Sequence, residues 1–210
     1  MDNLSGAIPP LPDTADELRA VAKVFNASKE EIVLGRRASE AVNKKLSSGG
    51  QLDDYRIVHF ATHGLVAGEI EGLGEPALAL SLPGRATEED DGLLMASEVA
   101  QLKLNADWVV LSACNTAAGE KPGAEALSGL ARAFFYSGSR ALLVSHWPVV
   151  SQAAVLLTTK TFASLKSNPA IGRAEALRRS MLSLIDEGEP YQRHPSYWAP
   201  FVVVGEGAKY

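Results

Sequence analysis

The sequence predicts an α/β fold with a mostly parallel central sheet and helices on both of its faces. Short apolar runs alternate along the chain with longer segments that carry apolar residues at helical spacing. The apolar runs are continuous rather than alternating, which is typical of strands buried on both sides. Glycine and proline residues separate these segments, so most of the predicted elements have clear ends.

The first half of the chain begins with an extended, proline-rich lead-in at residues 1–12. Asp13 and Thr14 then offer N-cap chemistry for a helix that carries Leu18, Val21 and Phe25 on one face. The further elements predicted in this half are a strand at 31–34, a helix at 37–46, a strand at 55–61, a strand at 77–82 and a short helix starting at Ala96. Loops are expected at 65–75 and 85–92.

The second half continues the alternation of strands and helices. A buried strand is predicted at 107–113, a helix at 124–137, a strand at 140–146, a helix at 152–165 and a last strand at 201–204. Pro169 is expected near the first turn of a further helix that runs to Asp186, because proline is well tolerated at that position.

Composition and charge narrow the possible functions. The 210 residues are 46% hydrophobic and 21% charged, as expected of a folded domain. The net charge of -5 argues against direct binding of nucleic acid, which needs clustered Lys and Arg. We see neither a secretory signal nor an apolar run long enough to cross a membrane, so we expect a cytoplasmic protein without a membrane partner. The single cysteine cannot form an internal disulfide.

Two predicted strands end in residues that can do chemistry. His63 follows the strand IVHFA, and Cys114, the only cysteine, follows the strand VVLS. If these strands are neighbours, both side chains face one cleft at the carboxyl edge of the sheet. An imidazole that takes the proton of a thiol produces a nucleophile for acyl transfer. The backbone N–H groups of Gly64 and Cys114 could then hold the developing oxyanion.

Less specific explanations exist for the same residues. A lone cysteine in an apolar setting is more often an inert core residue than a nucleophile. We interpret His59 as a buried structural residue, His146 as a weaker candidate at another strand end, and His194 as an exposed loop residue. The spacing of Cys and His suits no metal site, and we expect neither a metal nor a cofactor.

Four motifs together carry a family resemblance. They are HFATHG at 59–64, LSACNT at 111–116, SGSRALLVSHWPV at 137–149 and HPSYWAPFVVVG at 194–205. In this order they resemble the CHAT domain, a caspase- and separase-like cysteine peptidase domain that often follows tetratricopeptide repeats in bacterial proteins. The resemblance covers nearly the whole chain. It implies a caspase-haemoglobinase fold, a catalytic dyad of His63 and Cys114, and an oxyanion hole formed by Gly64 and Cys114.

The chain departs from the family after WPV, where relatives commonly carry an acidic pair. Val150 and Ser151 stand there instead. An acidic residue in the S1 pocket would pair with Arg or Lys of the substrate, so its loss predicts a small, polar or apolar P1 residue. Ser145, Trp147 and Ser151 are the expected substrate-binding residues, although Trp147 could equally be a core residue. Glu98 matches a recurrent family position, for which a capping or loop-holding role is at least as plausible as a catalytic one.

The resemblance therefore predicts one peptidase domain over 1–210 that cleaves a protein or peptide substrate through an acyl-enzyme. It also predicts regulation by a tetratricopeptide-repeat region in a longer protein. The alternative is a latent or non-catalytic interaction module of the same fold, and a plain α/β scaffold with a buried thiol is a third possibility.

Overall fold

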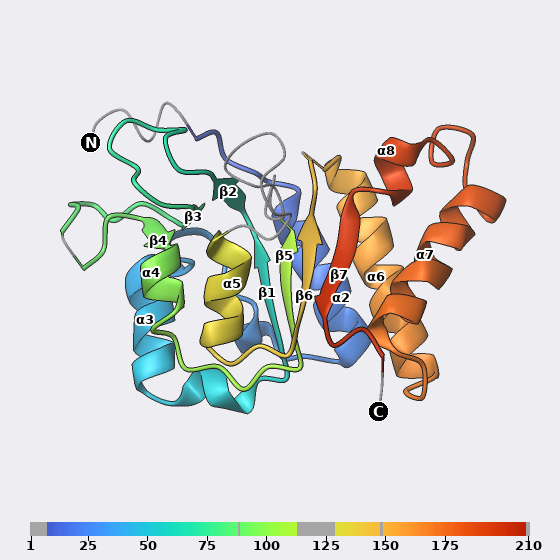
Figure 1. Ribbon diagram of the computed structural model, residues 1–210, viewed down its shortest axis with the longest axis horizontal. Coiled ribbons are helices and arrows are strands. Elements are labelled where there is room, and N and C mark those ends of the chain that lie inside the picture. Colours follow the sequence, from blue (N-terminus) through green and yellow to red (C-terminus); the bar gives the residue numbers. More distant parts are fainter. Residues whose placement is uncertain (1–7, 88, 113–128, 148, 209–210) are drawn as a thin grey trace.

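Two sheets form the centre of the protein (Figure 1). The computed structural model describes residues 8–87, 89–112, 129–147 and 149–208. The larger sheet has the order β1-β5-β6-β7. Its strands are β1 (Ile57–Ala61), β5 (Trp108–Ser112), β6 (Ala141–Ser145) and β7 (Phe201–Gly205). The first three are parallel and β7 is antiparallel to β6, which confirms a mostly parallel sheet.

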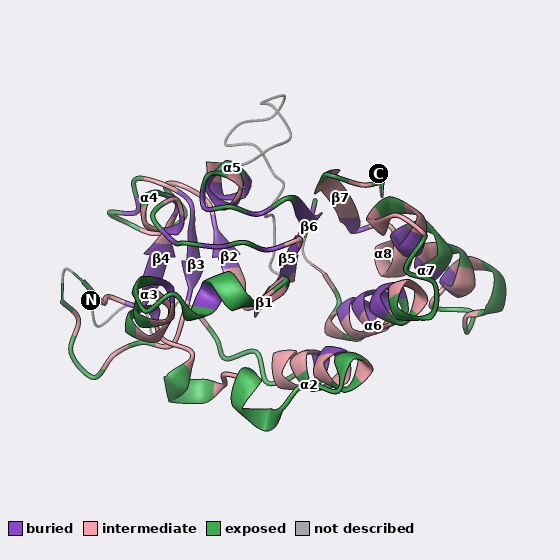
Figure 2. Cartoon of the chain, turned by 90° about the horizontal axis from the view of Figure 1, so that it is seen from below, coloured by how far each residue is buried: buried purple, intermediate pink, exposed green. Residues whose placement is uncertain are grey.

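Helices cover both faces of this sheet, as predicted (Figure 1). On one face lie α3 (Glu40–Ser48), α4 (Ala96–Val99) and α5 (Gly129–Tyr136), and on the other lie α2 (Thr14–Phe25), α6 (Ser151–Ser167), α7 (Arg173–Glu187) and α8 (Pro195–Trp198). Successive side chains of a strand point to opposite faces, so each face has its own apolar core. Val109 and Leu111 of β5 belong to the core on the α5 side, whereas Trp108 and Val110 belong to the core on the α6 side. Figure 2 shows most of the strands buried between the two groups of helices.

The smaller sheet has the order β2-β3-β4 and is antiparallel. Its strands are β2 (His63–Leu65), β3 (Ala77–Ala79) and β4 (Leu93–Met95). Only Thr62 separates β1 from β2, so the chain leaves the larger sheet and enters the smaller one within a single residue. A third apolar cluster, which includes Leu65 and Leu73 and against which Ile8 packs, covers one side of the smaller sheet.

Three expectations about elements are wrong or incomplete. Residues 31–34 form no strand: a 3₁₀ turn ends at Glu31, and the following residues are extended without a ladder partner among the described residues. Pro169 lies in the connection between α6 and α7, and α7 begins at Arg173, because Gly172 ends that connection in an extended conformation. The predicted helix at 124–137 is described only from Gly129 onward. Two further 3₁₀ turns occupy Gly35–Arg37 and Gln51–Asp54.

Candidate functional site

The strands that lead to His63 and Cys114 are direct neighbours. β1 and β5 are parallel, and Ala61 at the end of β1 is in register with Ser112 at the end of β5. His63 follows Ala61 by two residues, and Cys114 follows Ser112 by two residues. The expectation that the two residues follow neighbouring parallel strands is therefore confirmed for the strands themselves. Cys114 itself lies in 113–128, outside the described residues.

His63 begins strand β2 and is half-buried. It is in register with Ala79 of β3, and the hydroxyl of the preceding Thr62 donates to the carbonyl oxygen of Ala79. The Nε2 atom of His63 lies 2.7 Å from the carbonyl oxygen of Pro9. A carbonyl oxygen can only accept a hydrogen bond, so Nε2 carries the proton in this contact. In the neutral ring, Nδ1 is then the nitrogen with a lone pair available for a proton.

One half of the expected oxyanion hole lies in the described part of the chain. Gly64 is buried in β2, directly after His63, and is in register with Leu78 of β3. Its place in a paired strand gives its backbone a defined direction next to the imidazole. The other expected donor, the N–H of Cys114, lies outside the described residues.

The three expected substrate-binding residues differ in their exposure. Ser145 is the last residue of β6 and is completely buried. Trp147 follows in the connection to α6 with 39% of its surface exposed, and Val150, three residues later, is 43% exposed. Ser151, the first residue of α6, is half-buried. An exposed tryptophan that follows the carboxyl end of a parallel strand is placed where it could contact a ligand.

The other three histidines have the kinds of surroundings that we expect. His59 is buried within β1, and its Nε2 lies 3.2 Å from Oε1 of Glu17. His146 is exposed after β6, with its ring beside that of Trp147. His194 caps α8, because its Nδ1 accepts from the N–H of Ser196. Glu17 was not among the predicted site residues, because a carboxylate in the first turn of a helix normally faces solvent.

Glu98 has a capping and loop-holding role in this structure. Its Oε2 accepts from the N–H of Met95 at 2.9 Å, at the start of α4, and its Oε1 lies 2.7 Å from Nζ of Lys44. Nζ of Lys44 also lies 2.5 Å from Glu40. Burial works against the charge of Lys44, but hydrogen bonds to Glu40 and Glu98 outweigh it and raise the pKa of the ammonium. We call these three residues the Glu40–Lys44–Glu98 clamp.

The clamp holds the loop that leads into β4. Oε2 of Glu40, a residue that is 1% exposed, accepts the N–H groups of Asp91 at 2.9 Å and Gly92 at 3.1 Å. The carbonyl oxygen of Gly92 in turn accepts the N–H of Leu80, directly after β3. Since β3 pairs with the strand of His63, the clamp supports the outer sheet of the candidate site.

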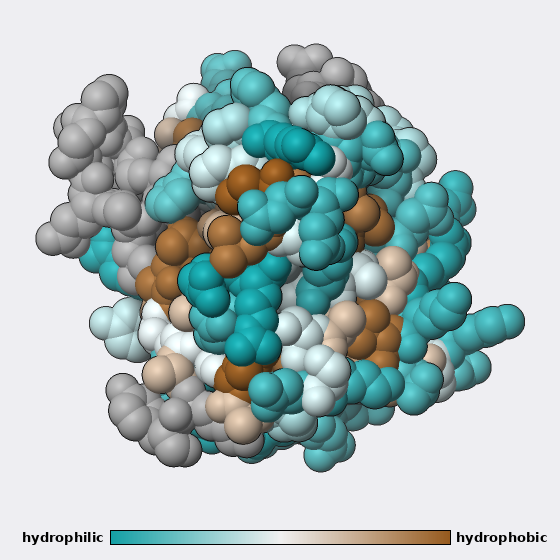
Figure 3. Space-filling view, turned by 90° about the vertical axis from the view of Figure 1, so that its right-hand side faces the viewer, coloured by the Kyte–Doolittle hydropathy of each residue, from teal (hydrophilic) through white to brown (hydrophobic). Residues whose placement is uncertain are grey.

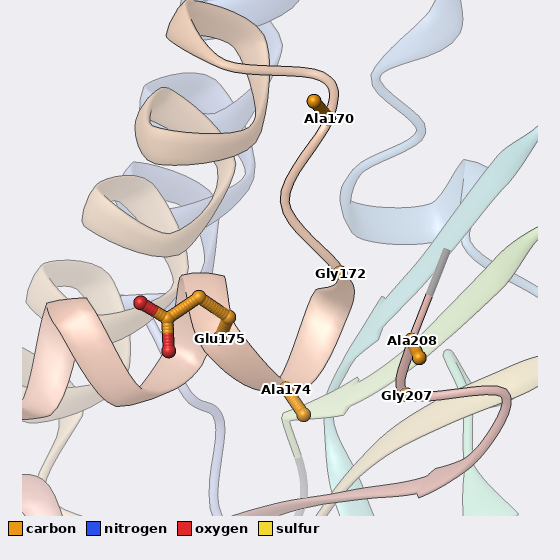
Figure 4. Close-up of a pocket in the computed structure, with 6 residues that line it drawn as sticks. All are labelled: Ala170, Gly172, Ala174, Glu175, Gly207 and Ala208. Atoms are coloured by element: carbon orange, nitrogen blue, oxygen red, sulfur yellow. The ribbon is translucent and has the colours of Figure 1, made fainter. Parts of the chain in front are cut away.

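A hollow lies at the opposite end of the larger sheet from His63 (Figure 4). It is lined by Ala170, Gly172, Ala174, Glu175, Gly207 and Ala208. Residues 207 and 208 follow the end of β7 that pairs with the start of β6, so this hollow lies away from His63. Its only charged group, Glu175, already binds Arg178 and Arg179. This arrangement offers no group for chemistry.

The rest of the surface formed by the described residues gives no further candidate. Within the described residues, no three His, Cys, Asp or Glu side chains come together in a way that could hold a metal ion. Every helix in that same part of the chain is too short or too polar to cross a bilayer. Figure 3 shows separate hydrophobic patches between hydrophilic residues on the face that carries α7, where Leu182 is 37% exposed.

Comparison with known proteins agrees with this arrangement. The family model of the CHAT domain matches residues 2–206. Tetratricopeptide repeat protein 28 of Mus musculus is 25% identical over 234 residues, and tetratricopeptide repeat protein 28 of Homo sapiens is 26% identical over 233 residues. Each alignment covers 95% of this chain, whereas the chain spans only 9% of the length of each relative. Because the family model matches nearly the whole sequence, the chain belongs to the CHAT domain family and has its caspase-like fold.

Proposed function

We propose that this chain is a single-domain cysteine endopeptidase that cleaves a protein substrate with a His63–Cys114 dyad. The observation that carries the proposal is the parallel register of β1 and β5, in which Ala61 lies opposite Ser112. Two neighbouring strands that end level with each other supply their next residues to the same edge of the sheet. Those residues include one imidazole and the only thiol of the chain.

The chemistry would be acyl transfer in two steps. The sulfur of Cys114 bonds to the scissile carbonyl carbon, and the N–H groups of Gly64 and Cys114 hold the oxyanion. The carbon–nitrogen bond then breaks, and the imidazole of His63 gives the leaving amine the proton taken from the thiol. Water next attacks the thioester, gives its proton to the imidazole and releases the carboxylic acid and the free thiol. No cofactor or metal is required.

The lead-in segment supports this role of His63. The carbonyl oxygen of Pro9 holds Nε2 at 2.7 Å, and this contact fixes the ring orientation and leaves Nδ1 to exchange protons. The segment also gives an adjoining region a physical route to the site. A displacement of Pro9 would release the imidazole, so a tetratricopeptide-repeat region before this domain could regulate cleavage. The names of the two relatives agree with such an arrangement.

For the substrate, we propose a small, polar or apolar P1 residue rather than Arg or Lys. Val150 and Ser151 occupy the positions where relatives commonly carry acids. Trp147 and Ser151 would contact the substrate directly, whereas the buried Ser145 would support the wall from behind. The test is a set of fluorogenic peptides that differ only at P1. Faster cleavage of the Arg or Lys peptide would contradict this preference.

The dyad is tested by the reactivity of its thiol. Because the chain has one cysteine, iodoacetamide reports on Cys114 alone. We expect native protein at pH 7 to react at least about tenfold faster than the urea-unfolded chain, since an activated thiol has a larger thiolate fraction. His63→Ala should remove this enhancement, and the exposed His146→Ala is the matched control that should keep it. An unenhanced native thiol, or full enhancement in His63→Ala, would contradict the dyad.

Cleavage is measured next with a peptide mixture and mass spectrometry. Wild type should produce new termini, and Cys114→Ala should produce none. His63→Ala should cleave about 10²–10⁴-fold more slowly, which is the usual contribution of a general acid–base. Cleavage by Cys114→Ala at the wild-type rate would exclude the acyl-enzyme mechanism.

The second candidate function is a latent or non-catalytic interaction module. It is favoured by the fact that the chain spans 9% of relatives named for tetratricopeptide repeats, so that such a domain could work within a larger protein. Activity is therefore compared for this domain with and without an adjoining repeat region and its partner. Cleavage only in their presence indicates latency. An unactivated thiol in both forms indicates an interaction module.

A further inference from the structure

A carboxylate lies buried beneath the two strand ends of the candidate site. Glu17 belongs to α2, and it is only 2% exposed. Burying a carboxyl group away from water is costly unless it has hydrogen-bonding partners. The other buried residue of this helix is the apolar Val21. A glutamate at such a position therefore needs an explanation in terms of its partners.

The partners of Glu17 come from three other elements. Its Oε2 accepts from the hydroxyl of Ser112 on β5 at 2.9 Å. Its Oε1 lies 3.2 Å from Nε2 of His59 on β1, a side chain with 7% exposure. Oε1 also lies 3.4 Å from the hydroxyl of Thr158 on α6, but that hydroxyl is closer to the carbonyl oxygen of Ala154, at 2.7 Å. Ser112 is therefore the principal hydrogen-bonding partner, whereas His59, whose buried ring nitrogens make no hydrogen bond among the described residues, meets Glu17 in a close polar contact.

These two partners stand just before the proposed dyad. Ser112 precedes Cys114 by two residues, and His59 precedes His63 by four. They belong to neighbouring strands, in which His59 is in register with Val110 and Ser112 with Ala61. One carboxyl group thus joins the last part of β1 to the last part of β5 through side chains rather than through the backbone ladder.

We infer that Glu17 is a positioning residue, which fixes the ends of β1 and β5 relative to each other and thereby the geometry of the reacting groups. This inference rests on the proposed function. Apolar side chains could fill the same space, and replacement of a buried ionic group by apolar residues is often neutral or stabilising for the fold. The hydrogen bond to Ser112 is directional and fixes relative position more narrowly than apolar packing does, and a displacement of about 1 Å at a reacting group can cost about 10²-fold in rate.

The test compares Glu17→Leu, Glu17→Gln and Ser112→Ala in the full chain. The probe is the rate constant for alkylation of Cys114 by iodoacetamide, measured against the unfolded chain. Glu17→Leu and Ser112→Ala should lose about tenfold or more of the native enhancement while the far-UV spectrum stays native. Glu17→Gln should keep it within about threefold, because an amide oxygen can still accept from Ser112. Thr158→Val is the matched control and should react like wild type, since its hydroxyl bonds mainly to Ala154.

Amide hydrogen exchange gives a readout that does not depend on thiol activation. Glu17→Leu should speed exchange at Ala61 and Ser112 and leave Leu142 and Leu143 in the centre of the sheet unchanged. Unchanged exchange at the strand ends would overturn the inference whether or not the thiol is activated. Wild-type alkylation enhancement in Glu17→Leu would overturn it and leave the dyad intact. If the native wild-type thiol reacts no faster than the thiol of the unfolded chain, the result contradicts the dyad rather than the role of Glu17. Amide hydrogen exchange then decides alone whether Glu17 holds the ends of β1 and β5 together.

Discussion

Removal of the Glu40 carboxylate should destabilise the protein measurably. Two backbone N–H groups depend on it, and that of Gly92 is buried. A buried donor that loses its acceptor costs about 1–3 kcal/mol. Lys44 is not left without a partner, because its Nζ keeps Glu98 at 2.7 Å and the carbonyl oxygen of Glu89 at 2.9 Å. We therefore expect Glu40→Ala to lower the free energy of unfolding by about 2–3 kcal/mol, less than the 3–5 kcal/mol of a broken, fully buried pair.

Glu40→Gln separates the hydrogen bonds from the charge. The amide oxygen can still accept from the loop, so this variant should lose only about 1 kcal/mol. Both values come from urea unfolding followed by circular dichroism, at constant slope. Glu175→Ala is the matched control, because this partly exposed carboxylate pairs with two exposed arginines; its urea midpoint should move little, since surface ion pairs contribute little. A midpoint for Glu40→Ala equal to that of wild type would refute the reasoning.

The difference in unfolding free energy between wild type and Glu40→Gln should depend on pH in a definite direction. Burial raises the pKa of Glu40 above 4.5, and repulsion from Glu98 adds to it, while hydrogen bonds from Lys44 and Asp91 act in the opposite direction. The folded state therefore holds this proton more tightly than the unfolded state. The resulting stabilisation is full below pH 4.5 and is lost as the pH rises through the folded-state pKa. The gap between wild type and Glu40→Gln should shrink over this window, and a gap that widens would contradict the direction.

Four further substitutions test the fold. Gly138→Ala should lower the free energy of unfolding by at least about 3 kcal/mol, because Gly138 has φ +107° and an added Cβ would lie 2.1 Å from the carbonyl oxygen of Leu104. Gly50→Ala, at φ +75° in open space, should lower it by only about 1 kcal/mol. Equal urea midpoints for the two variants would contradict this difference. Phe162→Ala should cost about 3–5 kcal/mol in the same assay, since this ring is completely buried, and a loss below 1 kcal/mol would contradict it. Asp107→Ala removes the shared partner of three arginines and should cost about 1 kcal/mol at low salt and less at 1 M NaCl; an equal loss at both salt concentrations would argue against an ionic cause.

The strands of the larger sheet could be predicted because each is a mostly apolar run of five residues between breakers. The direction of β7 could not be predicted, because an apolar run is the same read either way. Its antiparallel course is visible only in the pairing with β6, in which Gly205 lies opposite Ala141 and Phe201 opposite Ser145. The strands β2 and β4 have only three residues each, too few for a period to be seen.

The candidate site was predictable to a similar extent. The positions of His63 and Gly64 followed from a strand end, and the register of Ala61 with Ser112 agrees with the expected neighbours. Helical spacing places Glu17 on the face of Val21, four residues later, but a carboxylate in the first turn of a helix ordinarily faces solvent, so only the contact with Ser112 reveals why it is buried. Pro9 has no side-chain chemistry to signal its role, because it acts through its carbonyl oxygen.

The contact between Pro9 and His63 bears on where the boundary of this domain should be drawn. A truncation at Thr14 would keep every described helix and strand, and a boundary based on secondary structure would place it there. It would nevertheless remove the acceptor of the imidazole and Ile8, which packs against the cluster over the smaller sheet. Such a shortened protein would have the secondary structure of the whole domain without its oriented histidine. A shortened protein that keeps both contacts must therefore begin at or before Ile8.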